Sequence, residues 1–225
     1  MMEFVYYFML FATGDYFFYF LTNKIHEKYH KINKIDDVII PEFYDWVLGN
    51  AVSYVFIYLL YTQKIGYLYV NIADYSITYT LISPFAYFFL QDFLFYTMHR
   101  IAHIPFLYKR IHYVHHRHRQ PATWCGRISH WVDSNVENVA FTLPAIIMPI
   151  HEYIWMSCLI FTFIWGNFLH DSNNRKQLFL LNDNYDHCLH HYYGEKNCNY
   201  SYYFNHWDKI FGTYKKMKIR TRKIE

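Results

Sequence analysis

Three short histidine-rich segments decide how this chain folds: HRIAH (99–103), HYVHH (112–116) and HCLHH (187–191). Histidines three or four residues apart share one face of a helix. We therefore expect each segment to be helical and to project several imidazoles in one direction. This spacing is typical of metal ligands.

The number of these histidines favours two metal ions. Imidazole suits zinc, copper, nickel and iron, and a tetrahedral zinc site takes four ligands. The three segments supply eight histidines, and His130 and His170 lie between the second and third segments. If the two metals are iron, open coordination positions could bind and activate O₂ while the protein positions the substrate.

The composition narrows the other possibilities. A length of 225 residues predicts a single domain over residues 1–225. The four cysteines form no CxxC pair and no disulfide framework, which favours reduced thiols facing the cytosol. The basic stretch KRIHYVHHRHR (109–119) invites a nucleic-acid interpretation. Its cations alternate with metal-spaced histidines and the net charge is only +3, so we expect no nucleic-acid partner.

Four apolar segments predict an all-α, integral membrane helical bundle. Residues 2–22 are long enough to span a bilayer core. They lack a basic n-region and an A-x-A-like site, which favours a retained helix over a cleaved signal peptide. Residues 44–62 and 76–98 are the second and third segments, and residues 139–169, broken by prolines, predict a hairpin that enters the membrane and returns. The fold is therefore about four membrane segments with a histidine-rich helical cap.

The basic residues indicate which way the bundle faces. Cations are retained on the cytoplasmic side of membrane proteins, and four of them flank the second histidine segment: Lys109, Arg110, Arg117 and Arg119. The histidine cap is therefore expected in the cytosol, under the endoplasmic reticulum membrane of a eukaryote or the inner membrane of a bacterium. HEKYH (26–30) matches the HExxH pattern of zinc proteases, but it lies in a short charged loop and we interpret it as coincidence.

The three segments also carry a family resemblance. With Pro121 after the second segment, and NYS and WDKIFGTY after the third, they resemble the fatty acid hydroxylase/sterol desaturase superfamily of membrane di-iron oxygenases. The resemblance runs from about Asp92 to Tyr214. It implies a non-haem pair of iron ions that uses O₂ to oxidise an unactivated C–H bond of a membrane lipid, giving an alcohol or an alkene. The implied metal ligands are His99, His103, His112, His115, His116, His170, His187, His190 and His191.

Three more residues are candidates for catalytic roles. Asp92 is an acid inside a predicted membrane segment, two turns before His99, and is expected to orient a ligand imidazole; a snorkelling interfacial acid is the alternative. Asp171 forms an HD pair with His170. His130, in HWVD, resembles the HPxD segment of the sterol carbon-5 desaturase branch with tryptophan in place of proline. Its role stays open between ligand, substrate contact and structural histidine.

Other residues of these types are expected to be structural. His118, His151 and His206 are isolated from the three segments, and a lone histidine is more often a hydrogen-bonded structural residue. The closing segment of the family is matched by Asn199, Trp207, Asp208 and Gly212, for which packing is the expected role. Asp208 alternatively holds a ligand histidine.

The HWVD segment and His170 favour a sterol desaturase-like enzyme. A fatty acid or sphingolipid hydroxylase and a sterol methyl oxidase are the alternatives within the superfamily, and a membrane metal-binding or transport protein is the alternative outside it. The chain contains no GxGxxG, flavin or haem-attachment motif. The resemblance therefore implies an external electron donor, either cytochrome b5 with its NAD(P)H reductase or a ferredoxin. The basic faces near Lys109 and Lys215 would dock this donor or set the topology.

Overall fold

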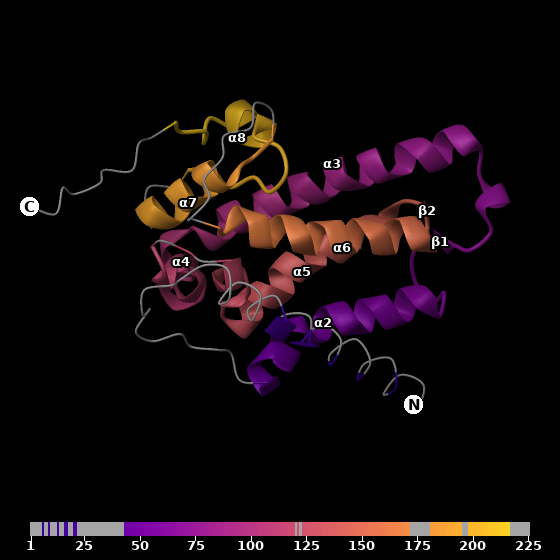
Figure 1. Ribbon diagram of the computed structural model, residues 1–225, viewed down its shortest axis with the longest axis horizontal. Helices are drawn as coiled ribbons and strands as arrows, with labels where there is room; N and C mark the ends of the chain where they lie inside the picture. Colours follow the sequence, from indigo (N-terminus) through magenta and orange to yellow (C-terminus); the bar gives the residue numbers. More distant parts are fainter. Residues whose placement is uncertain are drawn as a thin grey trace, which may run out of the picture.

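The computed structural model shows long helices running side by side, with shorter helices gathered at one end (Figure 1). The structure describes residues 43–119, 121, 123–171, 181–194 and 198–216, together with Tyr6, Met9, Thr13, Tyr16, Phe17, Phe20 and Leu21. Most of the predicted first membrane segment, and the HEKYH segment, therefore lie outside the described residues.

The elements are almost all helical, as the sequence predicts. In chain order they are α2 (Phe43–Tyr61), β1 (Leu68–Tyr69), the 3₁₀ helix η1 (Ile72–Asp74), α3 (Ile77–Ala102), α4 (Pro105–Arg110), the 3₁₀ helices η2 (His112–Arg117) and η3 (Thr123–Arg127), α5 (Trp131–Ile147), β2 (Ile150–His151), α6 (Glu152–Leu169), α7 (Asn184–Tyr193) and α8 (His206–Ile210). The all-α prediction misses β1 and β2, a parallel pair two residues long, and an isolated antiparallel bridge between Leu181 and Phe204.

The long helices lie close to where the apolar segments predict them. The predicted span 44–62 is α2, and the span 76–98 is α3, which continues through the first histidine segment. The predicted hairpin 139–169 is formed by α5 and α6, but α5 begins earlier, at Trp131. The first turns of α5 are polar because they pack against α2 through hydrogen bonds and not through apolar side chains.

Asn135 makes the main polar contact between α2 and α5. Its side-chain amide donates to the carbonyls of Leu48 (2.7 Å) and Trp131 (2.7 Å), and its amide oxygen accepts from the backbone N–H of Val52 (3.0 Å). A buried amide with all its partners in place stabilises a contact, whereas one left unpaired would cost free energy. The two helices therefore pack in a fixed register, running in the same direction.

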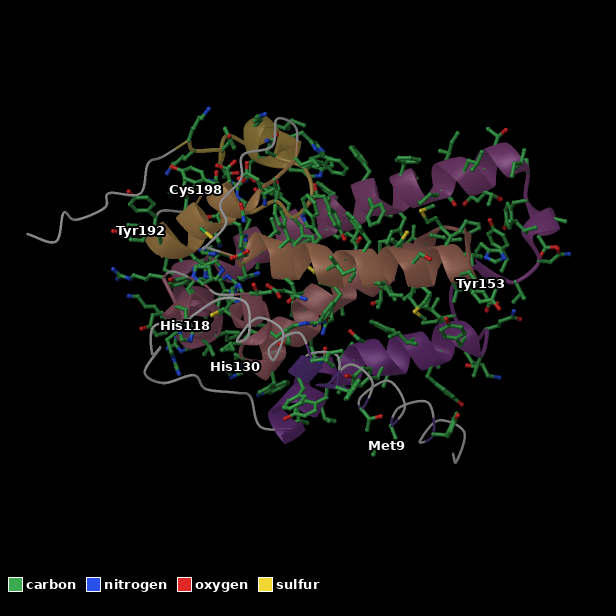
Figure 2. All side chains as sticks on the ribbon, in the orientation of Figure 1. Met9, His118, His130, Tyr153, Tyr192 and Cys198 are labelled. Carbon is green, nitrogen blue, oxygen red and sulfur yellow. The ribbon has the colours of Figure 1, made fainter. Side chains whose placement is uncertain are left out.

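An apolar core closes the end of the bundle that carries β1 and β2. It is built from Leu60, Tyr87, Ile150 and Trp155, all fully buried. The opposite end carries the histidine segments and α7. Figure 2 places His118, His130 and Cys198 at that end, and Tyr153 at the β1–β2 end.

One described helix is long and apolar enough to cross a membrane by length and composition. This helix is α6, and a shorter apolar stretch covers Val47–Tyr61 of α2. Large apolar side chains also lie exposed along α3, among them Ile77, Leu81 and Phe85, with exposed fractions of 67%, 63% and 75%. Exposed apolar surface of this extent is typical of a face that contacts lipid or protein.

Asp92, fully buried on α3, anchors a distant part of the chain. Its carboxylate accepts the backbone N–H groups of Tyr202 (2.9 Å), Tyr203 (2.7 Å) and Phe204 (3.2 Å). The expected contact between Asp92 and a ligand imidazole is thus not what the structure shows. Three successive N–H groups compete more effectively for this carboxylate, because they have no other partner once the segment is buried.

We predict that Asp92→Asn destabilises the fold. An amide offers one acceptor oxygen where the carboxylate offers two, so at least one buried N–H group loses its partner, at a cost of about 1–3 kcal/mol. Thermal unfolding of the detergent-solubilised protein should show a lowered Tm. The matched change Asp74→Asn, on an exposed residue of η1, should alter stability by less than about 0.5 kcal/mol. Equal Tm values for the two variants would contradict the anchoring role.

Candidate metal centre

The nine histidines predicted as ligands lie in two adjacent buried clusters. Within each cluster, one ring nitrogen from every histidine lies within 4.8 Å of the others. The first cluster contains His99, His103, His112, His116 and His190, and the second contains His115, His170, His187 and His191. No member is more than 5% exposed. The clusters touch, since the rings of His116 and His191 stack with centroids 4.5 Å apart.

The histidine segments divide between the clusters in a way that the sequence did not predict. HRIAH contributes both of its histidines to the first cluster, whereas HYVHH and HCLHH each contribute to both. The expectation that each segment projects its imidazoles in one direction is therefore wrong for the last two. The cause is geometric: neighbours such as His190 and His191 point about 100° apart around a helix, so a helix lying between two sites reaches both.

The elements that carry the clusters end or begin at the site. His170 is the C-cap residue of α6, and α3 ends one residue before His103. The third segment forms α7, whose first turn is capped by the Asp183 carboxylate, which accepts the backbone N–H of Asp186 (2.8 Å). Capping satisfies an N–H group that the helix leaves open. The ligands therefore lie on helices or at their C-caps and not on open loops.

Backbone carbonyls fix the orientation of four of the nine rings. The Nδ1 atoms of His99 and His190 lie 2.9 Å and 2.7 Å from the carbonyl oxygens of Tyr200 and Cys198. A carbonyl only accepts hydrogen bonds, so Nδ1 carries the proton in both rings and Nε2 carries a lone pair. The same arrangement holds in the second cluster. There the Nδ1 atoms of His115 and His170 face the carbonyls of Ile128 (3.2 Å) and Gly166 (2.7 Å).

The unprotonated nitrogens of these rings point at each other. The Nε2 atoms of His99 and His190 are 3.0 Å apart, and those of His115 and His170 are 3.4 Å apart. Two lone pairs at this distance repel unless a cation binds both. Two nitrogens that each lie about 2.1 Å from one metal ion are separated by about 3.0 Å at a right angle and about 3.4 Å at the tetrahedral angle. The donor set and its spacing therefore fit one metal ion in each cluster.

The protonation state agrees with this arrangement. Burial, followed by the neighbouring imidazoles, lowers the pKa of His116, His187 and His191 well below its usual value. The rings are neutral at neutral pH, which is the form that binds metal. His191 has no hydrogen-bond partner for either nitrogen within the described part of the chain, although both atoms are buried. A buried polar group without a partner is costly, and a metal ion would satisfy this one.

Asp133 is a site residue to which the sequence analysis gave no role of its own. Its carboxylate Oδ2 lies 2.7 Å from Nδ1 of His112, and both residues are buried. Such a carboxylate fixes the tautomer of a ligand histidine and raises its basicity. The signal was present in the sequence, since Asp133 is the last residue of the HWVD segment whose first residue, His130, was predicted as a site residue.

Two other predicted site residues, His130 and Asp171, belong to neither cluster of the described residues. His130 is the N-cap residue of α5, and its Nδ1 accepts the backbone N–H of Val132 (3.2 Å). This contact agrees with the structural alternative of the three that the sequence left open. Asp171 follows His170, and its backbone carbonyl accepts from the Asn184 side chain (2.9 Å); no described contact tests the predicted role of its carboxylate.

The Asp208 carboxylate accepts hydrogen bonds from the backbone and, among the described residues, contacts no ligand histidine. Its two carboxylate oxygens accept the N–H groups of Tyr200 and Ser201, both at 2.9 Å. The alternative role of Asp208 as the partner of a ligand histidine is therefore wrong. Among the histidines left out of the ligand set, His151 caps α6 at the far end of the bundle. His118 and His206 belong to neither cluster of the described residues.

A cavity of about 530 Å³ opens beside the two clusters. Histidines of both line it, namely His99 from the first, and His115, His170 and His187 from the second. The remaining walls come mainly from α2, α5 and α6, with Phe95 of α3, Arg127 of η3 and Tyr202. A volume of this size is enough for a ligand of several hundred daltons.

The fold and the site thus define a helical protein with buried histidine clusters that suit a pair of metal ions. Comparison with protein families agrees: residues 84–213, more than half of the chain, match the fatty acid hydroxylase family. The chain belongs to that family.

Several curated proteins are similar to most of the chain. Delta(7)-sterol 5(6)-desaturase ERG3B of Gibberella zeae is 29% identical over 217 residues, which is 93% of this chain and 62% of that protein. Lathosterol oxidase of Mus musculus is 25% identical over 218 residues, 94% of this chain and 71% of that protein. Delta(7)-sterol 5(6)-desaturase ERG3 of Saccharomyces cerevisiae is 24% identical over 150 residues, 67% of this chain and 40% of that protein. No solved structure matches the chain.

We predict that the two clusters lose metal independently. His103→Ala removes a ligand from the first cluster only, and His187→Ala removes one from the second only. Elemental analysis of each purified variant should show bound metal falling from two ions per chain towards one, and the double variant should bind less than either single variant. A single variant that loses both ions, while retaining its helical circular dichroism, would show that the clusters bind metal as one unit.

We predict that Asp133→Ala weakens metal binding without removing a ligand. Loss of the carboxylate frees the His112 ring to rotate and lowers its basicity, which typically costs 10–100-fold in metal affinity. Competition with a chelator measures this affinity. Asp133→Asn keeps an acceptor near Nδ1 and should lie between Asp133→Ala and the unchanged protein. The control Asp74→Asn should bind metal normally, and an unchanged affinity in Asp133→Ala would refute the role.

Proposed function

We propose that this chain is an O₂-dependent, non-haem di-iron enzyme that hydroxylates or desaturates an unactivated C–H bond of a membrane lipid, with a sterol as the favoured substrate. The observation that carries the proposal is that the cavity opens directly onto the two histidine clusters. Four of the clustered histidines line the cavity, so a lipid bound there would meet the metal centre directly. The similarity to sterol desaturases and to lathosterol oxidase supports the choice of a sterol.

Iron suits the ligand set better than zinc does. Two closed tetrahedral zinc sites would use eight ligands, whereas the clusters offer nine. All nine are imidazoles, which suit iron, and as neutral ligands they avoid the cost of burying several carboxylates. When bound, the iron pair would supply O₂ activation and removal of hydrogen from the substrate, chemistry that belongs to the cofactor.

The residues of the chain would exclude water and hold the substrate. Phe95, Phe141 and Tyr202 form an aromatic wall of the cavity, with ring centroids 4.6–5.5 Å apart. Phe95 also packs edge-on against His99, at 5.2 Å. A dry wall beside the metal ligands protects a reactive centre from side reactions with solvent. It also gives a rigid surface against which a flat hydrocarbon skeleton can pack.

A membrane location supports a lipid substrate. The apolar helix α6 lines the cavity on one face, and Ile160, Phe161 and Ile164 on the same helix are more than 40% exposed. Lipid tails would cover these side chains in a bilayer. The substrate would then reach the cavity from the membrane, and the clusters would lie at the cytosolic end of the helices, as the basic residues near Lys109 indicate.

Electrons would come from a separate protein. The sequence contains no nucleotide, flavin or haem-attachment motif, so we propose cytochrome b5 with its NAD(P)H reductase, or a ferredoxin, as the donor. A transport function is less well supported, because a transporter binds its ion near the middle of the membrane. These clusters lie where α3 and α6 end.

We predict that the chain restores a sterol double bond in yeast lacking its sterol C5-desaturase. Total lipids would be compared by mass spectrometry between cells expressing the intact chain and cells expressing a His190→Ala/His191→Ala variant, which loses one ligand from each cluster. A new sterol double bond should appear only with the intact chain. If the product is instead a hydroxylated fatty acid, sphingolipid or methylsterol, the protein is still an O₂-dependent lipid oxidase, but it is not a sterol desaturase.

The control is a histidine variant outside both clusters. His151→Asn keeps a residue type that caps helices well at the start of α6, so it should give as much product as the intact chain. Iron content would be measured on all three purified proteins. An iron-loaded intact chain that forms no oxidised lipid in yeast or with purified lipids would overturn the enzyme proposal.

A further inference from the structure

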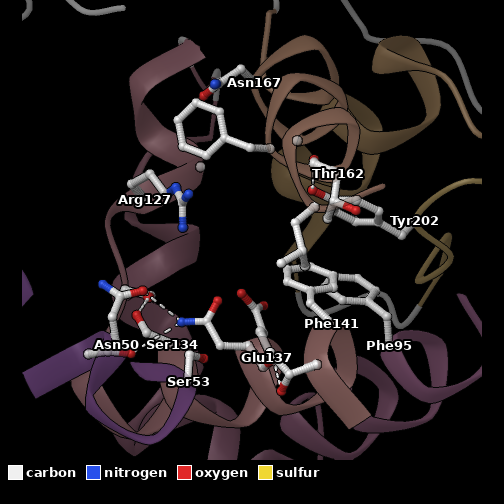
Figure 3. Close-up of a pocket in the computed structure, with 18 of the residues that line it drawn as sticks. Asn50, Ser53, Phe95, Arg127, Ser134, Glu137, Phe141, Thr162, Asn167 and Tyr202 are labelled. Carbon is white, nitrogen blue, oxygen red and sulfur yellow. Dashed lines mark hydrogen bonds between the residues drawn. The ribbon is translucent and has the colours of Figure 1, made fainter. Parts of the chain in front are cut away.

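The cavity beside the clusters has a polar end and an apolar end. Figure 3 shows Arg127 and Glu137 pointing into it from opposite sides, near Asn50 and Ser134. The carboxylate and amide lining residues of α5, Glu137 and Asn138, come before Phe141. Both ends therefore belong to one continuous space with a steep change in polarity.

Three helices agree on where the polar end lies. On α2, the lining residues Asn50 and Ser53 precede Ile57. This helix runs in the same direction as α5, because Gly49 packs against Ser134 while Gly66, beyond the end of α2, packs against Ala145. On α6 the order is reversed, with apolar Leu159 and Ile160 before Asn167, as expected for a helix that ends at His170. On α2, α5 and α6, the carboxylate and amide side chains that line the cavity thus lie toward the metal end.

The polar end is close to the metal ligands. A carboxylate oxygen of Glu137 lies within 4.8 Å of both the Asp133 carboxylate and a His112 ring nitrogen. Arg127 follows Gly126, where an added Cβ would lie only 2.7 Å from the His170 ring. The Arg127 guanidinium lies over the Phe163 ring, 4.4 Å from its centroid. The polar end is therefore lined by neighbours of the ligands His112 and His170.

Two polar atoms at this end lack a hydrogen-bond donor or acceptor among the described residues. The Ser53 hydroxyl is buried, with the residue 7% exposed, and has no hydrogen-bond partner in the described part of the chain. Asn138 donates through its amide nitrogen to Asn50 Oδ1 (2.8 Å) and to the Gly49 carbonyl (3.4 Å). No described residue donates to its amide oxygen. An unpaired hydroxyl costs free energy in the fold, so these atoms suit a ligand that completes their hydrogen bonds.

The cavity as a whole is long enough for a rigid hydrocarbon. Its lining residues on α6 run from Met156 to His170, fourteen positions, or about 21 Å at the helical rise. Ile57 and Leu159 line its apolar end from two helices. A substrate with one polar group would lower its free energy most by placing that group at the metal end and its hydrocarbon away from it.

We infer that the polar end binds the hydroxyl group of an amphipathic lipid, through Ser53 and Asn138, so that the enzyme oxidises a carbon close to that hydroxyl. The inference rests on the proposed function, since it assumes that the cavity holds the substrate. A sterol fits this arrangement, because its hydroxyl is on the first ring and the 5(6) bond adjoins the second. A long acyl chain oxidised far from its head group does not fit.

The test compares lathosterol with the hydrocarbon that lacks its hydroxyl, using the full-length, iron-loaded chain in lipid nanodiscs. The unchanged protein should bind lathosterol at least about tenfold more tightly, as expected for hydrogen bonds to buried groups. Ser53→Ala and Asn138→Leu should each reduce this preference about three- to tenfold, with little change in the Kd of the hydrocarbon. Equal preference in the unchanged protein and both variants would overturn the inference.

Two features keep the result interpretable. Ser53→Ala breaks no described hydrogen bond, so its ligand-free Tm should be equal to or above that of the unchanged protein, even if Asn138→Leu folds poorly. Ser157→Ala, which removes an exposed hydroxyl on α6, is the matched control and should keep the full preference. Turnover is measured on the same samples. If both ligands are oxidised but lathosterol is not bound more tightly, the inference is wrong and the proposed function stands. If lathosterol is bound more tightly but neither ligand is oxidised, the proposed function is wrong and the hydroxyl-binding site stands.

Discussion

The structure depends on pairs of imidazole nitrogens whose lone pairs face each other. His99 and His190 approach to 3.0 Å, and His115 and His170 to 3.4 Å, with the protons of all four rings committed to backbone carbonyls. Proton sharing cannot relieve this repulsion, because the carbonyls hold the protons on the far side of each ring. A cation can. Metal binding and the folding of this end of the bundle are therefore coupled, as they are wherever a site is assembled from distant segments.

Two carboxylates hold the segment that makes this arrangement possible. Asp208 accepts the N–H groups of residues 200 and 201, and Asp92 accepts those of residues 202 to 204. Five successive amides are thus fixed by two side chains, one of them from α3, more than 100 residues earlier. The carbonyl of Tyr200, in the same segment, receives the His99 proton. A buried hydrogen-bond network is stable only when every donor and acceptor in it has a partner. Asp92 and Asp208 therefore support the metal centre through the backbone, although neither touches a ligand histidine in the described part of the chain.

Much of the fold could be read from the sequence, because apolar runs are local signals. The spans at 44–62 and 76–98 correspond to α2 and α3 within a few residues, and 139–169 covers α6 and the second half of α5. The nine histidines could be selected as a group because the three segments resemble a known family. Their division into two clusters could not, because it depends on which rings of α3, η2, α6 and α7 meet in space, a tertiary property. The partners of Asp92 were missed likewise, since no sequence spacing shows which backbone amides will arrive from residues 202 to 204.

One helix connects the three properties on which the proposed chemistry depends. The outer face of α6 is apolar and exposed, its inner face lines the cavity, and its C-cap residue is His170. Glycines set the close packing around it: a Cβ at Gly166 would collide with the Tyr202 hydroxyl, and one at Gly126 would collide with the His170 ring. A substrate lying along α6 therefore touches the same rigid element that positions a ligand.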